Sequence, residues 1–192
     1  MKTVKNILLC GVGGQGTILA SQILSYALVS GGYDVKMSEI HGMSQRGGSV
    51  VTQVRYGEKV YSPIIGQGSA DILVSFEEME ALRNLPDLAP DGKIVVNDYR
   101  IETATTASGA ESYPAYIMET LKSKADTYVL DAAEIAKSLG NEKCMNVVLL
   151  GALVKLMGID NLDWNSALKA CVKPQFVELN AKAFVAGMDA VK

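Results

Sequence analysis

Apolar residues along the chain fall into short continuous runs and longer segments with helical spacing, and glycines separate them. The run from Val4 to Cys10 predicts a buried strand, and the stretch Gly11 to Gly16 interrupts the apolar pattern directly after it. From Thr17 to Val29 apolar side chains cover most of a helical wheel, which predicts a deeply buried helix. Gly31 and Gly32 are typical of the end of such a helix. The chain therefore begins as strand, glycine loop and helix.

The rest of the chain continues this alternation and then becomes helical. Further strands are predicted at Tyr33–Ser38, Ser49–Tyr56, Lys59–Ser62, Ala70–Ser75, Lys93–Asn97 and Thr127–Leu130. Further helices are predicted after Ser75 and Asp131, which start capping-box patterns, and at Tyr116–Lys124, Met145–Met157, Trp164–Val172 and Pro174–Gly187. Gly57 and Glu58 separate the two strands between Ser49 and Ser62, and this spacing predicts a β-hairpin.

This order of elements predicts the fold class. Strands that alternate with helices favour a three-layer α/β/α domain around a mainly parallel sheet, to which the hairpin adds an antiparallel element and the C-terminal third a helical part. The 192 residues contain no repeat, low-complexity tract or linker. Residues 1–192 are therefore expected to form a single domain.

Charge and composition exclude several function classes. The formal net charge is −3 and the basic residues are dispersed, so we expect no nucleic-acid partner. The three cysteines, Cys10, Cys144 and Cys171, lie far apart, and none belongs to a C-x-x-C pair, so we expect no metal or iron–sulfur cluster on this chain. No apolar stretch approaches the roughly 20 residues of a membrane span. The expected protein is cytoplasmic and has no membrane partner.

The glycine loop is the first candidate site. Gly11, Gly13, Gly14, Gln15 and Gly16 belong to a G-x-G-x-x-G pattern between a strand and a helix, where backbone amides at the helix start favour an anion such as a phosphate. The pattern has a second interpretation, in which the glycines only let the helix pack closely on the sheet. The sequence leaves both open.

A second loop follows the next strand. Glu39 lies about where a dinucleotide-binding fold carries the acid that binds ribose hydroxyls. After it, Gln45, Arg46, Gly47 and Gly48 bring hydrogen-bond donors and bare backbone into one short segment, which suits a phosphate, a carboxylate or a partner surface. The alternative is a tight turn with a solvated arginine.

The sequence predicts no catalytic residue. His41 is the only histidine, and a structural or interface role is favoured over acid–base chemistry because the sequence identifies no partner for it. No nucleophile–base set, metalloprotease motif or Walker A lysine is present.

Four segments together resemble the gamma subunit, or gamma domain, of 2-oxoacid:ferredoxin oxidoreductases that act on pyruvate, 2-oxoglutarate, branched-chain oxoacids or indolepyruvate. They are GVGGQGTILASQIL at 11–24, SEIHGMSQRGGSVVTQVR at 38–55, NVVLLGAL at 146–153 and VELNAKAFVAG at 177–187. The second is the most specific, because a glutamate, a histidine and a Q-R-G-G loop before a strand are not a general dinucleotide-binding feature. It looks closest to the indolepyruvate or generic oxoacid branch.

The resemblance implies a subunit that is inactive alone. Thiamine-binding alpha and beta subunits would hold thiamine diphosphate, and 4Fe-4S clusters in partner subunits would pass electrons to a ferredoxin-like subunit or to ferredoxin. The complex would oxidatively decarboxylate a 2-oxoacid to an acyl-coenzyme A. The resemblance leaves open whether this chain itself contacts coenzyme A. Two alternatives remain: an NAD- or FAD-binding Rossmann-type oxidoreductase, and a scaffold that binds no small molecule. The isolated chain could also form a homo-oligomer.

Overall fold

A computed structural model describes residues 4–42 and 47–191. The strands are β1 (Lys5–Val12), β2 (Asp34–His41), β3 (Ser49–Gly57), β4 (Ala70–Ser75), β5 (Leu88–Asn97) and β6 (Asp126–Leu130). The α-helices are α1 (Thr17–Ser30), α2 (Glu78–Asn84), α3 (Ala104–Ala107), α4 (Ile117–Lys124), α5 (Ala132–Ser138), α6 (Met145–Met157), α7 (Trp164–Cys171) and α8 (Val177–Ala190). Short 3₁₀ helices occur at Leu85–Asp87, Glu142–Cys144 and Pro174–Phe176.

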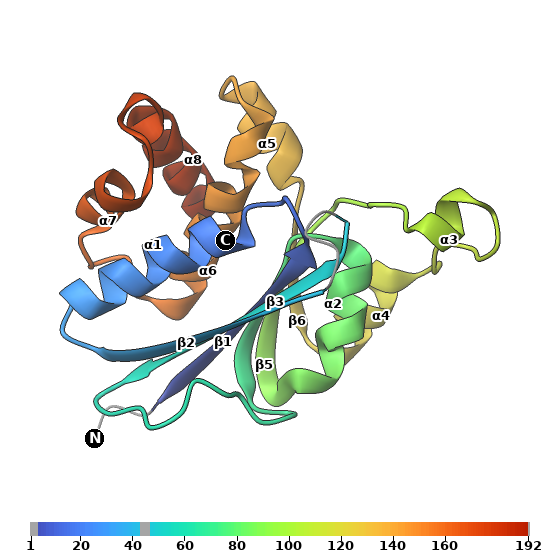
Figure 1. Cartoon of the computed structure of the whole chain (residues 1–192), viewed down its shortest axis with the longest axis horizontal. Helices are drawn as coiled ribbons and strands as arrows, with labels where there is room; N and C mark the ends of the chain where they lie inside the picture. Colours follow the sequence, from blue (N-terminus) through green and yellow to red (C-terminus); the bar gives the residue numbers. More distant parts are fainter. Residues whose placement is uncertain (1–3, 43–46, 192) are drawn as a thin grey trace.

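The three-layer α/β/α architecture is confirmed. Helices α1 and α5 to α8 cover one face of the sheet, and α2 and α4 cover the other (Figure 1). The sheet order is β2-β3-β1-β4-β5-β6. Strands β1, β4, β5 and β6 are parallel to one another, and β3 is antiparallel to both of its neighbours, β1 and β2. Among the helices of the described residues, none is both long and apolar enough to cross a membrane.

The antiparallel hairpin exists, but its partners differ from the prediction. Strand β3 pairs with β2 along its length, whereas residues 59–62 form no strand. Side chains hold that segment instead of a backbone ladder: the Val60 amide donates to the Asp34 carboxylate at 3.0 Å, and Arg55 donates to the Ser62 carbonyl at 2.9 Å. Val60 is buried. The apolar, β-branched character of the sequence at Val60 therefore reflects packing into the core and not pairing as a strand.

The two predicted helix caps had different outcomes. Asp131 accepts from the Glu134 amide at 2.9 Å, which confirms it as an N-cap. The cap predicted at Ser75 is displaced by two residues, because Glu77 is the N-cap of α2 and accepts from the Glu80 amide at 2.9 Å. The Ser75 hydroxyl donates to the Glu77 carbonyl at 2.6 Å and so supports the turn before the helix.

Helices α6 and α8 approach each other closely through two glycines that belong to the family-like segments. A β-carbon on Gly151 would lie 2.0 Å from the Phe184 carbonyl oxygen, and one on Gly187 would lie 1.9 Å from the Val148 carbonyl oxygen. Neither position can accept a side chain unless the helices separate. Gly151 and Gly187 therefore build the core, whereas Asn146, at the start of the first segment, donates to the Gly16 carbonyl of the glycine loop at 3.2 Å.

Candidate functional site

The two loops singled out from the sequence meet at the carboxyl end of β1. The Gly13 amide donates to the Gly48 carbonyl at 2.8 Å, and the Gly42 amide donates to the Ser49 carbonyl at 3.0 Å across the base of the second loop. This proximity arises because β3 runs antiparallel to β1, so that Ser49 begins opposite Val12. Gln45 and Arg46 lie outside the described residues.

Gln15 turns its side chain back into the glycine loop. Its Oε1 accepts from the Val12 amide at 2.7 Å, and its Nε2 donates to the Phe76 carbonyl at 2.8 Å. The residue is only 6% exposed. Both ends of the amide are thus satisfied inside the protein, and Gln15 connects the end of β1 to the turn after β4.

The glycines of this loop serve different purposes. A β-carbon on Gly11 would lie 2.9 Å from both Gln15 Oε1 and Phe76 Cβ, and one on Gly16 would lie 2.6 Å from Asn146 Nδ2. Close packing therefore explains these two. Gly14 has a φ of +103°, and no described atom lies within 4 Å of the β-carbon it would carry. Gly14 marks where the loop faces open space.

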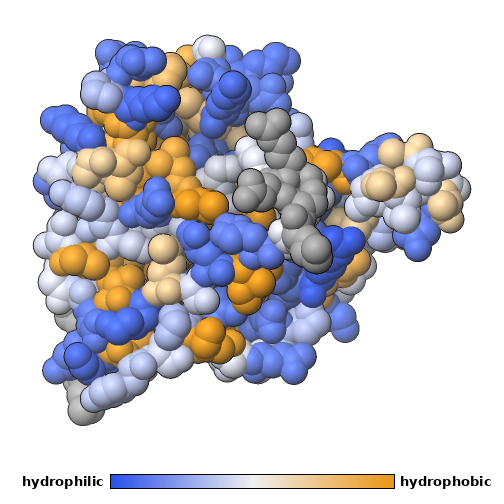
Figure 2. Space-filling model, viewed as in Figure 1, coloured by the Kyte–Doolittle hydropathy of each residue, from blue (hydrophilic) through white to orange (hydrophobic). Residues whose placement is uncertain are grey.

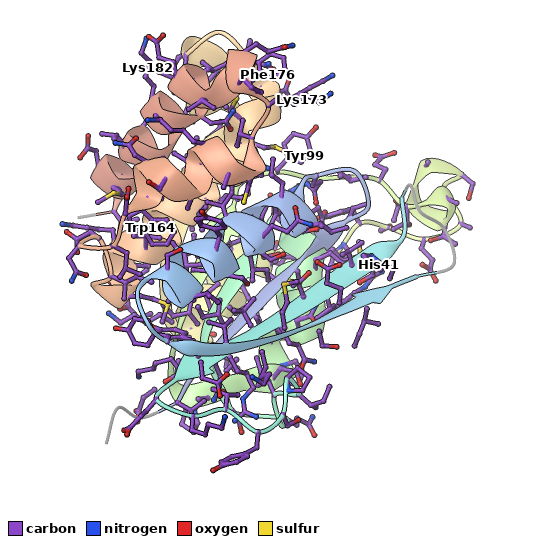
Figure 3. The ribbon with its side chains drawn as sticks, turned by 60° about the vertical axis from the view of Figure 1, so that its left-hand side comes forward. His41, Tyr99, Trp164, Lys173, Phe176 and Lys182 are labelled. Atoms are coloured by element: carbon purple, nitrogen blue, oxygen red, sulfur yellow. The ribbon has the colours of Figure 1, made fainter. Side chains whose placement is uncertain are left out.

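Glu39 and His41 lie on β2, which is an edge strand of the sheet. Glu39 Oε1 accepts from Ser21 Oγ at 3.4 Å, and its Oε2 lies 3.5 Å from His41 Nε2. Figure 3 shows His41 on this strand, apart from the helical layer that carries Trp164. In a dinucleotide-binding fold the ribose-binding acid follows a strand directly beside the first. Here β3 separates β2 from β1, and this placement argues against a ribose contact by Glu39.

Three buried carboxylates on the far side of the glycine loop were missed as site residues. Glu77, Glu78 and Glu80 follow β4, and each is 1% exposed. Glu80 accepts from Ser49 Oγ at 2.6 Å and from Arg83 Nη1 at 2.6 Å, so α2 is tied to the start of β3. The sequence signal was the unusual run Ser75-Phe-Glu-Glu-Met-Glu80 after an apolar strand, which the capping pattern explained only in part.

The other two carboxylates hold the segment that follows β5. Glu78 Oε2 accepts from Arg100 Nε at 2.9 Å, and Glu77 Oε1 accepts from the Ile101 amide at 3.2 Å and from the Tyr113 hydroxyl. Burial raises the pKa of Glu78 above its ordinary value, and the ion pair with Arg100 opposes this shift. The cluster is therefore built to organise backbone at the edge of the sheet.

The described residues offer little for covalent or metal chemistry. The Cys10 thiol is fully buried beside the Ser75 hydroxyl at 3.3 Å, and burial raises its pKa. A thiol in such surroundings is a poor nucleophile. Within residues 4–42 and 47–191, no group of three or more histidine, cysteine, aspartate or glutamate side chains is arranged to hold a metal ion.

Comparison with known proteins decides the family. The family described as pyruvate ferredoxin/flavodoxin oxidoreductase matches residues 6–190. The chain belongs to this family. The indolepyruvate oxidoreductase subunit IorB of Pyrococcus horikoshii is 36% identical over 195 residues, covering 97% of this chain and 96% of that protein. The predicted resemblance is confirmed, and the chain is a subunit of a 2-oxoacid:ferredoxin oxidoreductase.

Solved structures support the same assignment. The gamma subunit of a keto/oxoacid ferredoxin oxidoreductase from Geobacter sulfurreducens is 26% identical with a TM-score of 0.72, and 97% of each chain is covered. A 2-oxoglutarate:ferredoxin oxidoreductase from Magnetococcus marinus, solved with 2-oxoglutarate, coenzyme A and succinyl-CoA bound, has the same fold with a TM-score of 0.76 at 21% identity. The match covers 99% of this chain but 31% of that one. The NAD- or FAD-linked alternative receives no support from these relatives.

The raised pKa of Glu78 predicts a pH-dependent contribution to stability. Because the folded chain holds this proton more tightly than the unfolded chain, Glu78 stabilises the fold most below its ordinary pKa near 4.5, and this contribution is lost as the pH rises through the folded value. Glu78→Gln should remove that pH dependence. Denaturant unfolding of both proteins between pH 4 and 7 should show the stability of the wild type falling relative to the variant as the pH rises. A difference that stays constant or grows with pH would contradict the assignment.

Proposed function

We propose that the chain is the gamma-type subunit of a complex that oxidatively decarboxylates indolepyruvate or a related arylpyruvate. The observation that carries this proposal is the end-to-end match to the IorB subunit of Pyrococcus horikoshii at 36% identity. The match includes the SEIHGMSQRGGSVV segment, which meets the glycine loop through the Gly13–Gly48 hydrogen bond. The segment with the most specific family resemblance therefore lies at the candidate site.

In this proposal the reaction is divided between subunits. Partner subunits would hold thiamine diphosphate, which would supply the decarboxylation chemistry, and 4Fe-4S clusters, which would carry electrons to ferredoxin. This chain contributes a rigid edge of a sheet on which two glycine-rich loops are held together. The side chains of Gln15 and Glu80 support such a role, because their hydrogen bonds fix the backbone around the two loops.

We further propose that the mouth between the two loops contacts a phosphate of coenzyme A in the assembled complex. Gly14 and Gly47 both have positive φ values and both face open space among the described atoms. The start of α1 offers amides that favour an anion, and Gly13 and Gly48 lie beside it. We propose a phosphate contact for Arg46 from its place in the sequence directly before Gly47. The homologous enzyme from Magnetococcus marinus was solved with coenzyme A bound. Gly11, Gln15 and Gly16 hold the loop in shape.

Reconstitution tests the substrate assignment. The isolated chain should not reduce a redox dye with any 2-oxoacid, because thiamine diphosphate and the clusters belong to other subunits. Co-expressed with its partner subunits, it should support coenzyme A-dependent dye reduction with indolepyruvate at a higher kcat/KM than with 2-oxoglutarate or pyruvate. Oxoacid oxidation by the isolated chain would contradict the division of labour, and a preference for 2-oxoglutarate would contradict the substrate proposal.

A substitution in the loop tests the coenzyme A contact separately. Gly13→Val places a branched side chain at the proposed mouth, so the reconstituted complex should show a KM for coenzyme A raised about tenfold, equivalent to the loss of a single good contact. Gly31→Ala, at the other end of α1, is the matched control, because its β-carbon would lie 2.7 Å from Leu162 Cδ2. The control should lower the melting temperature and leave the KM for coenzyme A unchanged. If Gly13→Val behaves like the control, the loop is a packing element and not a binding site.

A further inference from the structure

The segment from Asp98 to Tyr116, here called the arm, projects from the carboxyl edge of the sheet. It carries α3 and extends well beyond the helices beside it (Figure 1). From Ile101 to Tyr116 no residue is buried. Apart from Tyr113, which is partly buried against the core cluster on the α2 face, the arm gains little hydrophobic stabilisation from its position. Its projecting shape therefore needs another explanation.

The base of the arm is fixed firmly to the start of α2. On the outgoing side the Glu78 amide donates to the Tyr99 carbonyl at 3.1 Å, and Arg100 donates to the Glu78 carboxylate. On the returning side the Tyr113 hydroxyl donates to Glu77, and the Arg100 guanidinium lies 5.3 Å from the centre of the Tyr113 ring. Two buried carboxylates thus hold both ends of the arm, and the direction of its projection is set.

The tip of the arm is held by its own hydrogen bonds. The Thr106 amide donates to Thr103 Oγ1 at 3.2 Å, which caps α3, and Thr105 donates to the Glu111 carboxylate at 3.0 Å. Ser108 Oγ donates to the Thr105 carbonyl at 3.0 Å. The tip is therefore shaped in advance by its own hydrogen bonds, as suits a segment that docks on another subunit at little cost in ordering.

The arm ends at a strained residue. Tyr116 has a φ of +62°, the one positive value at a non-glycine residue in the described parts of the chain, and its side chain is 75% exposed. A bulky residue in the left-handed region is destabilising, and such strain often marks functional segments. No burial of the tyrosine within the chain offsets the strain. Its ring is available on the same projecting segment.

The chemistry of the arm indicates what it fits. Residues 103–112 are small, rich in hydroxyl groups, and coloured mostly in pale shades of intermediate hydropathy in Figure 2. Glu102 and Glu111 are the only charged residues between Ile101 and Tyr116, and no lysine or arginine occurs between Arg100, at the base of the arm, and Lys122. Small side chains allow close backbone approach, and the acidic bias complements a basic surface.

We propose that the arm is a clasp that docks into a narrow groove on a partner subunit of the same oxidoreductase complex, lined by basic side chains and other hydrogen-bond donors. The base of the arm also places that partner next to the glycine loop, because Phe76, directly before Glu77, accepts the hydrogen bond from Gln15. Docking of the arm would set the partner over the loop mouth. The inference uses membership of the complex and does not depend on the substrate or on coenzyme A.

Hydrogen exchange and association measurements test the clasp. Amide exchange in peptides that span 101–116 should slow about tenfold or more when the isolated chain is compared with the purified complex, because docking excludes water from the arm. Ala107→Arg and Ala110→Arg each place a long side chain on the exposed tip. Each should raise the Kd for the partner subunits about tenfold and leave the melting temperature of the isolated chain unchanged. Ala170→Arg on α7, also exposed, is the matched control and should change neither quantity.

Charge reversal tests the chemistry of the groove. Glu102→Lys should weaken association and reduce its dependence on salt concentration. Equal exchange of 101–116 in the isolated chain and the complex, or unchanged affinity of both arginine variants, would overturn the clasp. Loss of self-association of the chain with intact binding to partner subunits would also overturn it, in favour of a second copy as the occupant. All of these measurements are made without oxoacid or coenzyme A. A negative result for the clasp therefore does not bear on the substrate proposal, and a negative result for the substrate proposal does not bear on the clasp.

Discussion

The buried side chain of Gln15 is the contact on which the candidate site depends. Its two hydrogen bonds, to the Val12 amide and the Phe76 carbonyl, join the glycine loop to the turn that begins α2. Removal of this side chain would take the acceptor from the buried Val12 amide, at a cost of about 1–3 kcal/mol. The Phe76 carbonyl would keep its hydrogen bond from Asn97 Nδ2 at 3.3 Å. The loop is therefore closed by its own chain, whereas in a dinucleotide-binding fold the corresponding amides hold a pyrophosphate.

The carboxylates of α2 extend this framework in two directions. Glu80 binds Ser49 at the start of β3, next to the second glycine-rich segment, and Glu77 and Glu78 bind the base of the arm. One short helix thus connects the two loops to the projecting segment. A chain organised in this way presents backbone and a fixed surface to its neighbours. This agrees with its place as a subunit of a larger oxidoreductase.

The sequence predicted the fold through signals that depend on local chemistry. Apolar runs bounded by glycines located β1 and α1, and Asp131 was a true cap because a carboxylate three residues before a free amide needs no distant partner. The strand predicted at 59–62 was wrong because side chains satisfy the backbone there: Asp34, 26 residues before Val60, accepts from the Val60 amide, and Arg55 of β3 donates to the Ser62 carbonyl. Contacts from side chains to backbone of that kind leave no periodic pattern in the sequence.

The sequence located the two glycine-rich loops of the candidate site but not the contacts that bring them together. Proximity of the two glycine loops follows from the antiparallel pairing of β3 with β1, which no local motif reveals. Gln15 was selected as a ligand contact, but its place inside the loop depends on the Phe76 carbonyl 61 residues away. The acids of α2 resembled a cap, and their burial appears only once the arm and β3 are packed around them.

The most direct test of this account is the exchange rate of the Val12 amide in the isolated chain without any ligand. Val12 is 8% exposed and donates to Gln15 Oε1 at 2.7 Å, so its amide should exchange as slowly as those of the central residues of β1. Gln15→Ala should accelerate exchange at Val12 while Leu9, deeper in the strand, stays protected. Fast exchange at Val12 in the wild-type chain, slowed only by coenzyme A or by partner subunits, would show that a ligand and not Gln15 closes the loop.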